Sequence, residues 1–221
     1  MTRTGLLLAS AALLTLTGVA AHAQEKVFRY ATTGDILGLD PHSHNEGPTN
    51  TMKNNFYGRL IHRAPDLSLE PDLATSWERI DDTTWRFDLR PDVTFHNGNP
   101  FTASDVVYSF NRQSQDSSEM SFALSSVADV TAVDDLTVEV KTSAPDPTLL
   151  LNMPNFYIVD EEFMEANDAF EVIAGAGQTN FANLNVNGTG PYRLVEWVQD
   201  NQVVLEPNED WWGHETRTDN I

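Results

Sequence analysis

Short stretches of the chain alternate apolar and polar residues, and this period of two predicts β-strands with one buried face. Trp85, Phe87 and Leu89 alternate with charged residues in this way, and a turn at residues 81–82 precedes them. Two later pairs of extended stretches each flank turn-forming residues, which predicts two further hairpins. A stretch rich in β-branched and aromatic residues near the start predicts one more short strand. The expected strand segments are residues 27–32, 127–133, 136–140, 192–199 and 202–206.

Apolar residues spaced by three or four positions predict helices with one apolar stripe. Met52, Phe56 and Leu60 have this spacing, and we expect them to lie in the core. Thr102 and Asp105 have the spacing of a capping box, which predicts the start of a helix. The expected helices cover residues 49–61, 102–112, 148–153 and 160–170. Because hairpins and helices are mixed without a regular strand-helix rhythm, the sequence predicts an α/β or α+β domain.

The first 23 residues have the pattern of a secretory signal peptide. Arg3 is followed by an apolar stretch from residue 5 to residue 21, and Ala21-His22-Ala23 forms a small-x-small cleavage site. Polar residues interrupt the stretch, which falls short of the ~20 apolar residues that a membrane span requires. The chain contains no cysteine, so neither a disulfide nor a lipid-modified cysteine after the signal is possible. We therefore expect residues 24–221 to be free in the periplasm, without a lipid anchor.

Acidic residues greatly outnumber basic ones in this chain. It has 33 Asp and Glu residues against 13 Lys and Arg residues, and its formal net charge is −20. Such a surface repels nucleic-acid phosphates and anionic lipid head groups, so we expect no nucleic acid among the partners. With 40% hydrophobic residues, the chain can still fill a real core.

The sequence carries little that indicates catalysis. The glycines at 188 and 190 suggest a phosphate loop, but Pro191 removes one amide and a strand is expected next, so we reject a nucleotide site. No Gly-x-Ser-x-Gly nucleophile motif occurs. The adjacent aspartates at 81–82 and 134–135 lie at predicted turns, where Asp hydrogen-bonds its own backbone. We therefore expect no catalytic residue, no enzyme activity and no cofactor.

A long loop from residue 34 to residue 48 contains the most suggestive polar cluster, since loops of this length are often functional. Asp40, His42, His44 and Glu46 are of the residue types that hold zinc or nickel. Their alternate spacing on a loop is a weak metal signal, so we treat the two histidines as weak candidates and expect no metal requirement. Of the three interpretations, we favour the one in which these residues shape a ligand-binding loop. The other two are metal ligation and a plain solvated loop.

Two longer stretches resemble the extracellular solute-binding protein family 5, which includes the dipeptide-, oligopeptide- and nickel-binding components of ATP-driven importers. Residues 85–112 read WRFDLRPDVTFHNGNPFTASDVVYSFNR, and residues 188–192 read GTGPY. Asn187 departs from the family, which more often has an apolar residue before this turn. Shorter matches in the family's order are LDPH at 39–42, LATSW at 73–77, Asn208, and WWG at 211–213.

The resemblance implies a fold and a mechanism. The expected fold is an α/β, periplasmic-binding-protein type II-like lobe with mixed sheets and hairpins, formed by residues 24–221. Family members are longer and close two lobes around the ligand, so we expect this chain to be truncated before the second lobe. The implied function is periplasmic capture of a small peptide by a monomeric receptor, which delivers it to a cognate ABC permease in the inner membrane.

The resemblance also implies which residues contact the ligand, because the family's turn after the first strand faces the cleft. The expected ligand-binding residues are Thr33, Gly34, Asp35, Ile36 and Leu37, with Phe122, Met153 and Phe156 as weaker candidates. A nickel- or metal-chelate-binding protein and an opine-binding protein of the same family stay open as alternatives. A secreted hydrolase and a structural envelope protein are more remote ones.

Overall fold

The computed structural model describes residues 27–175 and 177–213. The chain divides into two units, of which the first includes residues 27–30 and the second includes residues 31–175 and 177–213. The described part of the first unit, residues 27–30, forms no helix or strand. All elements described below belong to the second unit. The predicted signal peptide lies outside the described residues.

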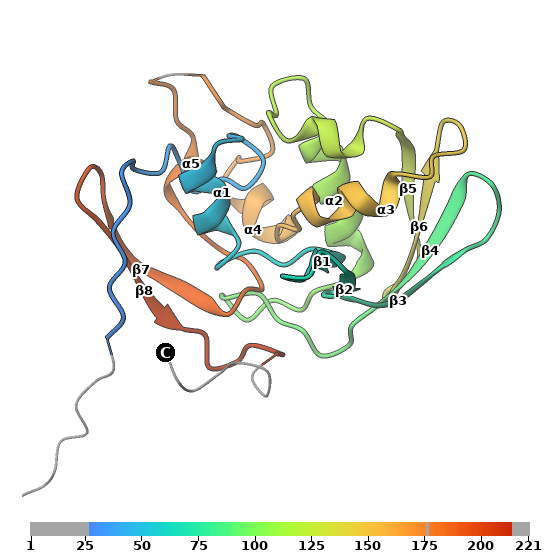
Figure 1. Cartoon of the computed structure of the whole chain (residues 1–221), viewed down its shortest axis with the longest axis horizontal. Helices are drawn as coiled ribbons and strands as arrows, with labels where there is room; N and C mark the ends of the chain where they lie inside the picture. Colours follow the sequence, from blue (N-terminus) through green and yellow to red (C-terminus); the bar gives the residue numbers. More distant parts are fainter. Residues whose placement is uncertain (1–26, 176, 214–221) are drawn as a thin grey trace, which may run out of the picture. The chain divides into compact units, whose positions relative to one another are not determined.

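The largest sheet has four antiparallel strands in the order β3-β4-β6-β5. These strands are β3 (Ala74–Arg79), β4 (Thr84–Leu89), β5 (Val127–Asp134) and β6 (Thr137–Thr142). Helix α2 (Ala103–Gln113) packs against β5 and β6 on one side of the sheet (Figure 1). The strand expected around residues 85–89 and the hairpin expected at 127–140 are therefore confirmed.

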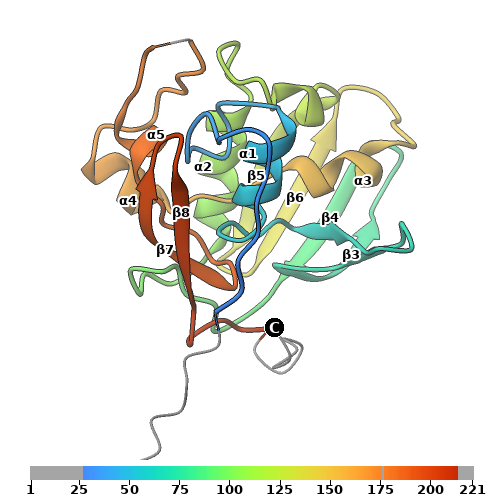
Figure 2. The same ribbon diagram turned by 60° about the vertical axis from the view of Figure 1, so that its left-hand side comes forward.

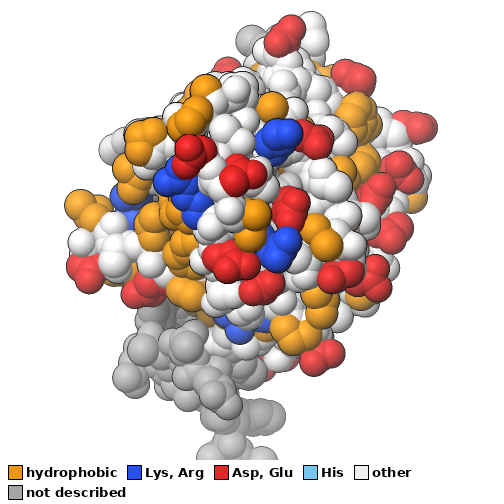
Figure 3. All heavy atoms as spheres, turned by 90° about the vertical axis from the view of Figure 1, so that its right-hand side faces the viewer, with side chains coloured by type: hydrophobic (Ala, Val, Ile, Leu, Met, Phe, Trp, Pro, Cys, Tyr) orange, Lys and Arg blue, Asp and Glu red, His pale blue; other side chains and the backbone are white. Residues whose placement is uncertain are grey.

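The period-two pattern separates the two faces of this sheet. Phe87, Val138 and Val140 are fully buried on the side of the core. Arg86 and Glu139, their chain neighbours, form an ion pair with 2.7 Å between Nη2 and Oε1 on the other side. Seen from the side of the sheet, many acidic side chains and fewer Lys and Arg side chains are at the surface, with apolar side chains between them (Figure 3). The outer face is thus a solvated, mainly acidic surface.

Helix α2 begins where the capping box predicts. The carboxylate of Asp105 accepts a hydrogen bond of 2.8 Å from the backbone N–H of Thr102, which fixes the first turn. The helix then contributes to two hydrophobic cores: Val106 belongs to the core beneath the sheet, and Tyr108 belongs to a second core. α2 is therefore the element that the two cores share.

The second core lies under the C-terminal hairpin of β7 (Tyr192–Val198) and β8 (Gln202–Pro207), which confirms the third predicted hairpin. This hairpin runs beside α4 (Glu161–Ala166) and α5 (Phe181–Leu184) (Figure 2). Trp197, Val203 and Leu205 of the hairpin pack on the core, as the alternation predicts. The remaining elements are α1 (Gly47–Lys53), β1 (Ile61–Arg63), β2 (Leu69–Pro71), α3 (Leu149–Asn152), and the 3-10 helices η1 (Ser121–Leu124) and η2 (Met153–Asn155).

The predicted helix at 49–61 is wrong in its second half, because α1 ends at Lys53. The carbonyl oxygens of residues 55, 56 and 58 accept hydrogen bonds from the N–H groups of residues 192, 190 and 158. A helix would need these carbonyls for its own i→i−4 bonds. Distant segments therefore override the local pattern, although Phe56 and Leu60 are buried as expected.

Three other boundaries differ from the prediction. Residues 27–32 form no strand, because no described strand pairs with them. The helix expected at 160–170 ends at Ala166, where Asn167 caps it and Asp168 has a left-handed φ of 51°. The helix expected at 148–153 is confined to residues 149–152 and followed by a 3-10 turn. Among the described residues, no helix has the length and apolar character needed to cross a membrane.

The acidic surplus predicts that stability rises with ionic strength, because salt screens the repulsion among excess negative charges. In urea, which is uncharged, raising NaCl from about 0.05 M to about 0.5 M should move the unfolding midpoint to higher urea. Neutralising exposed acidic residues, for example with Asp116→Asn and Glu171→Gln, should flatten this response. A midpoint that stays constant or falls as NaCl rises would contradict the prediction.

Candidate functional site

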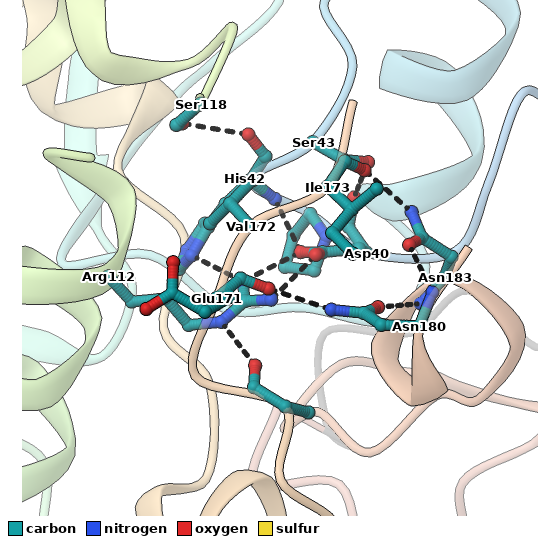
Figure 4. A network of polar contacts seen from close by, with 12 residues as sticks. Asp40, His42, Ser43, Arg112, Ser118, Glu171, Val172, Ile173, Asn180 and Asn183 are labelled. Carbon is teal, nitrogen blue, oxygen red and sulfur yellow. Dashed lines mark hydrogen bonds and ion pairs between the residues drawn. The ribbon is translucent and has the colours of Figure 1, made fainter. Parts of the chain in front are cut away.

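The long loop after residue 34 is anchored by a buried ion pair and is not a plain solvated loop. Residues 38–43 are all buried. At their centre, Asp40 and Arg112 are both fully inaccessible to solvent and meet in a two-pronged contact, with Oδ1–Nη1 at 2.8 Å and Oδ2–Nη2 at 2.6 Å (Figure 4). Burial opposes ionisation of Asp40, but the charge and hydrogen bonds of Arg112 outweigh it and hold the pKa of Asp40 below its usual value.

His42 lies in the same buried network, and its contacts fix its tautomer. Its Nε2 lies 2.9 Å from the carbonyl oxygen of Tyr157 and therefore donates a proton. Its Nδ1 lies 2.9 Å from Nη1 of Arg112 and therefore accepts one. Burial, and then the Arg112 charge, lower the pKa of His42 to about 3. The ring is neutral at neutral pH and has no free nitrogen for a metal ion.

The backbone carbonyls of the loop accept hydrogen bonds from two side chains that follow the loop in the sequence, Lys53 and Tyr57. Nζ of Lys53, at the end of α1, donates to the carbonyls of Pro41 and His44 at 3.0 Å each. The hydroxyl of Tyr57 donates to the carbonyl of Leu39 at 3.2 Å. Burial lowers the pKa of Lys53 to about 8, so its ammonium group remains mainly charged at neutral pH. The loop conformation is therefore set by α1 as well as by Arg112.

A second segment, residues 118–122, is fastened to the same loop. Ser118 Oγ donates to the carbonyl of His42 at 2.8 Å, and the Glu119 carboxylate accepts from the Asn45 N–H at 2.8 Å. Phe122 therefore belongs to a segment that is hydrogen-bonded to the loop through Ser118 and Glu119. Phe122 is 45% exposed and lines a groove of about 330 Å³. The other lining residues are Phe110, Ser114, Asp116, Ser121, Leu124, Ser125 and Val127.

The expected ligand-binding turn at residues 33–37 has mixed exposure. Thr33 and Gly34 are exposed, and the Leu37 side chain is 59% exposed. Ile36 is instead buried in the second core, where its packing anchors the turn. The Asp35 carboxylate accepts from the N–H of Ile36 at 2.8 Å and from the N–H of Asp200, in the β7–β8 turn, at 2.6 Å. Asp35 therefore joins this turn to the hairpin.

Two of the weaker candidates lie in the interior of the fold. Met153 and Phe156 are fully buried in the core beneath the sheet, where their packing accounts for both residues. Neither side chain reaches the surface of this chain. His44, the second weak metal candidate, lies 3.9 Å from Glu119, with Nδ1 facing Oε1. Sequence reasoning missed Arg112 altogether, although it closes one of the stretches that resemble the family.

An acidic cluster that the sequence does not reveal is formed by Asp105, Asp160 and Glu162, whose oxygens lie within 4.8 Å of one another. One oxygen of Asp160 accepts hydrogen bonds from the amide groups of three asparagines, and the other caps α4. Burial, opposed in part by hydrogen bonds from the backbone, raises the pKa of Asp105 to about 6. The three asparagines are Asn97, Asn99 and Asn187. Asn187, the departure from the family pattern, is therefore used in a polar network.

Comparison with known proteins identifies the family of this chain. The family model described as "Bacterial extracellular solute-binding proteins, family 5 Middle" matches residues 68–221. The chain belongs to this family. The family 5 assignment agrees with the mixed α/β fold and with the order of motifs along the sequence.

Relatives within family 5 differ in what they are named for binding. The glutathione-binding protein GsiB of Pectobacterium atrosepticum is 30% identical over 86% of this chain, and the match covers 35% of GsiB. The dipeptide-binding protein of Escherichia coli is 27% identical over 99% of this chain and 44% of its own length. The structure of MoaA from A. tumefaciens R10 in complex with mannopinic acid has a TM-score of 0.70 and 29% identity, covering 81% of this chain and 36% of MoaA. The chain thus spans less than half the length of these relatives.

Proposed function

We propose that the chain is part of the periplasmic substrate-binding component of an ATP-driven importer, and that it captures a small peptide. The observation that carries the proposal is that two surface segments are joined to the same buried loop. Residues 33–37 lead into this loop, and residues 118–122 are hydrogen-bonded to it. Residues 33–37 present the exposed Leu37, and residues 118–122 present the exposed Phe122. Exposed apolar side chains on two linked segments suit a ligand that itself carries apolar side chains, as many small peptides do.

The remaining parts of the proposal follow from this role. The receptor acts as a monomer after export and loss of residues 1–23, and it delivers its ligand to a cognate permease in the inner membrane. It binds its ligand without turnover and needs no metal or cofactor. These points are supported by the family assignment and by the engagement of both His42 ring nitrogens within the protein.

An opine is the second candidate ligand. It is favoured by one observation, the 29% identity to MoaA, a protein solved with mannopinic acid. A peptide and an opine are distinguished by titrating the same protein separately with trialanine and with mannopinic acid. Binding of mannopinic acid alone would replace the peptide in the proposal.

Phe122→Ala is expected to weaken peptide binding by about tenfold, or about 1.4 kcal/mol, because aromatic side chains that anchor a ligand are among the few contacts that dominate a binding energy. Binding is measured by amide chemical-shift changes on titration with trialanine, which also detects millimolar affinities. The matched control is Val133→Ala, which truncates another exposed apolar side chain. Val133 lies six residues along β5 from Val127, about 20 Å from the groove.

Two results would contradict the proposed peptide site or its location. If shifts do not saturate with any of several tripeptides, the chain has no peptide site. If Val133→Ala weakens binding as much as Phe122→Ala, the groove beside Phe122 is not the site.

A further inference from the structure

Arg112 connects three segments that lie far apart in the sequence. Its guanidinium contacts Asp40 and His42 in the loop, and its Nε donates to the carbonyl of Ala169 at 3.0 Å (Figure 4). We infer that Arg112 is the positioning residue that holds the loop at 38–45 and the segment at 118–122 in place for the ligand. This inference rests on the proposed function, because it assigns a role within the same site.

The shape of the guanidinium is what the contact geometry requires. Asp40 receives two parallel hydrogen bonds, and His42 Nδ1 receives a third from the same nitrogen that binds Oδ1. A planar fork with donors in fixed directions satisfies all of these acceptors at once. The single ammonium group of a lysine has three donors that radiate from one atom and cannot reproduce the two parallel bonds. Positive charge alone is therefore insufficient at this position.

The contacts also explain how the effect of Arg112 reaches the second segment. Arg112 fixes the His42 ring, and the carbonyl of His42 accepts the hydroxyl of Ser118. The next residue, Glu119, binds the loop again through the N–H of Asn45. Phe122 is the last residue of the second segment and Leu37 directly precedes the first, so we expect the positions of both to depend on the same buried contact.

Helix α2, which carries Arg112, is itself held in place by hydrogen bonds and by packing in both hydrophobic cores. The neighbouring Gln113 donates from Nε2 to the carbonyls of Met120 and Asn155 and accepts the N–H of Tyr157 at Oε1. α2 also packs into both hydrophobic cores. Arg112 thus fixes the loop relative to a well-packed helix. The loop itself forms no helix or strand between residues 31 and 46.

Two variants and one control test the inference by amide hydrogen exchange measured segment by segment. Arg112→Lys retains the charge and removes the fork. The double variant Asp40→Leu with Arg112→Met replaces the buried ion pair by apolar side chains, a change that often leaves overall stability intact. In both, exchange should accelerate at least about tenfold in residues 38–45 and 118–122, while β6 stays protected.

The control is Val140→Ala, which destabilises the core under the sheet without touching the loop. It should accelerate exchange in β6 and leave both loop segments relatively unchanged. Unaltered loop exchange in the double variant, or equal acceleration in Val140→Ala, would overturn the positioning role.

Titration of each variant with trialanine completes the test. Both Arg112 variants should lose at least about tenfold in affinity, whereas Val140→Ala should bind as the wild type does while it remains folded. If exchange accelerates but affinity is unchanged, the loop is fixed by Arg112 without consequence for the ligand, and the inference is wrong. If the wild type binds no trialanine, the peptide proposal fails, and the exchange data still decide whether Arg112 positions the loop.

Discussion

Gly188→Ala is expected to destabilise the chain by about 3 kcal/mol or more, a substantial share of the roughly 5–15 kcal/mol that keeps a typical domain folded. A Cβ atom at this position would lie 2.1 Å from the carbonyl oxygen of Phe56 and 2.9 Å from Cδ1 of Tyr57. The first of these atoms is backbone, so no side-chain rotation relieves the clash. Gly190 donates its N–H to the same Phe56 oxygen at 2.8 Å, so any shift that relieves the clash also breaks this bond.

The matched control is Gly47→Ala, the same substitution in the first turn of α1, where an added Cβ meets nothing within 4 Å. It should change stability by less than about 1 kcal/mol, because it only reduces backbone freedom. Urea unfolding of both variants measures the difference. Equal midpoints would mean that the 188–190 segment is not held as closely to residue 56 as described.

Acid is expected to unfold the chain through the buried His42. Its pKa is about 3 in the folded state and 6.5 in its ordinary environment, so between these values the unfolded chain binds the extra proton. Stability should therefore rise with pH from about 3 to about 6.5, and this contribution is complete above that range. Each pKa unit corresponds to about 1.4 kcal/mol, so the effect amounts to several kcal/mol.

Asp40 adds to the loss at the acid end, because its pKa is also lowered in the fold. Asp105 acts in the opposite sense: its pKa is raised to about 6, so its contribution falls as the pH rises from about 4 to about 6. The His42 contribution is therefore isolated by comparison with His42→Gln, whose amide can donate to the Tyr157 carbonyl but does not titrate. Urea unfolding at several pH values should give a difference between the two proteins that grows as the pH rises from about 3 to about 6.5 and is constant above that range. A difference independent of pH would show that His42 is not the group responsible.

Local patterns predicted the hairpins well, because the information that forms them is close together in the chain. In β4, the alternation of Trp85, Phe87 and Leu89 matches the burial of the strand, and the adjacent turn residues fix its start. The capping box of Thr102 and Asp105 is similarly local, and it places the start of α2 correctly. The family resemblance then supplied the fold, which no single element could indicate.

The site was less predictable, because the contacts that form it join distant segments. Asp40 and Arg112 are 72 residues apart, and His42 and the Tyr157 carbonyl are 115 residues apart. The alternate spacing of Asp40, His42 and His44 gave a weak signal for metal ligands, whereas the buried Arg112 is the partner of Asp40 and His42. Likewise, the apolar spacing of Met52, Phe56 and Leu60 gave the correct burial for the last two residues but the wrong backbone conformation.

The position of α2 between the two cores has a consequence for the cooperativity of unfolding. Because Val106 packs into one core and Tyr108 into the other, the helix cannot leave either core without exposing apolar surface in both. A partly unfolded form that keeps one core intact but releases α2 therefore loses hydrophobic stabilisation on two sides at once. Such a form should be sparsely populated, so residues 31–213 are expected to unfold in a single all-or-none step.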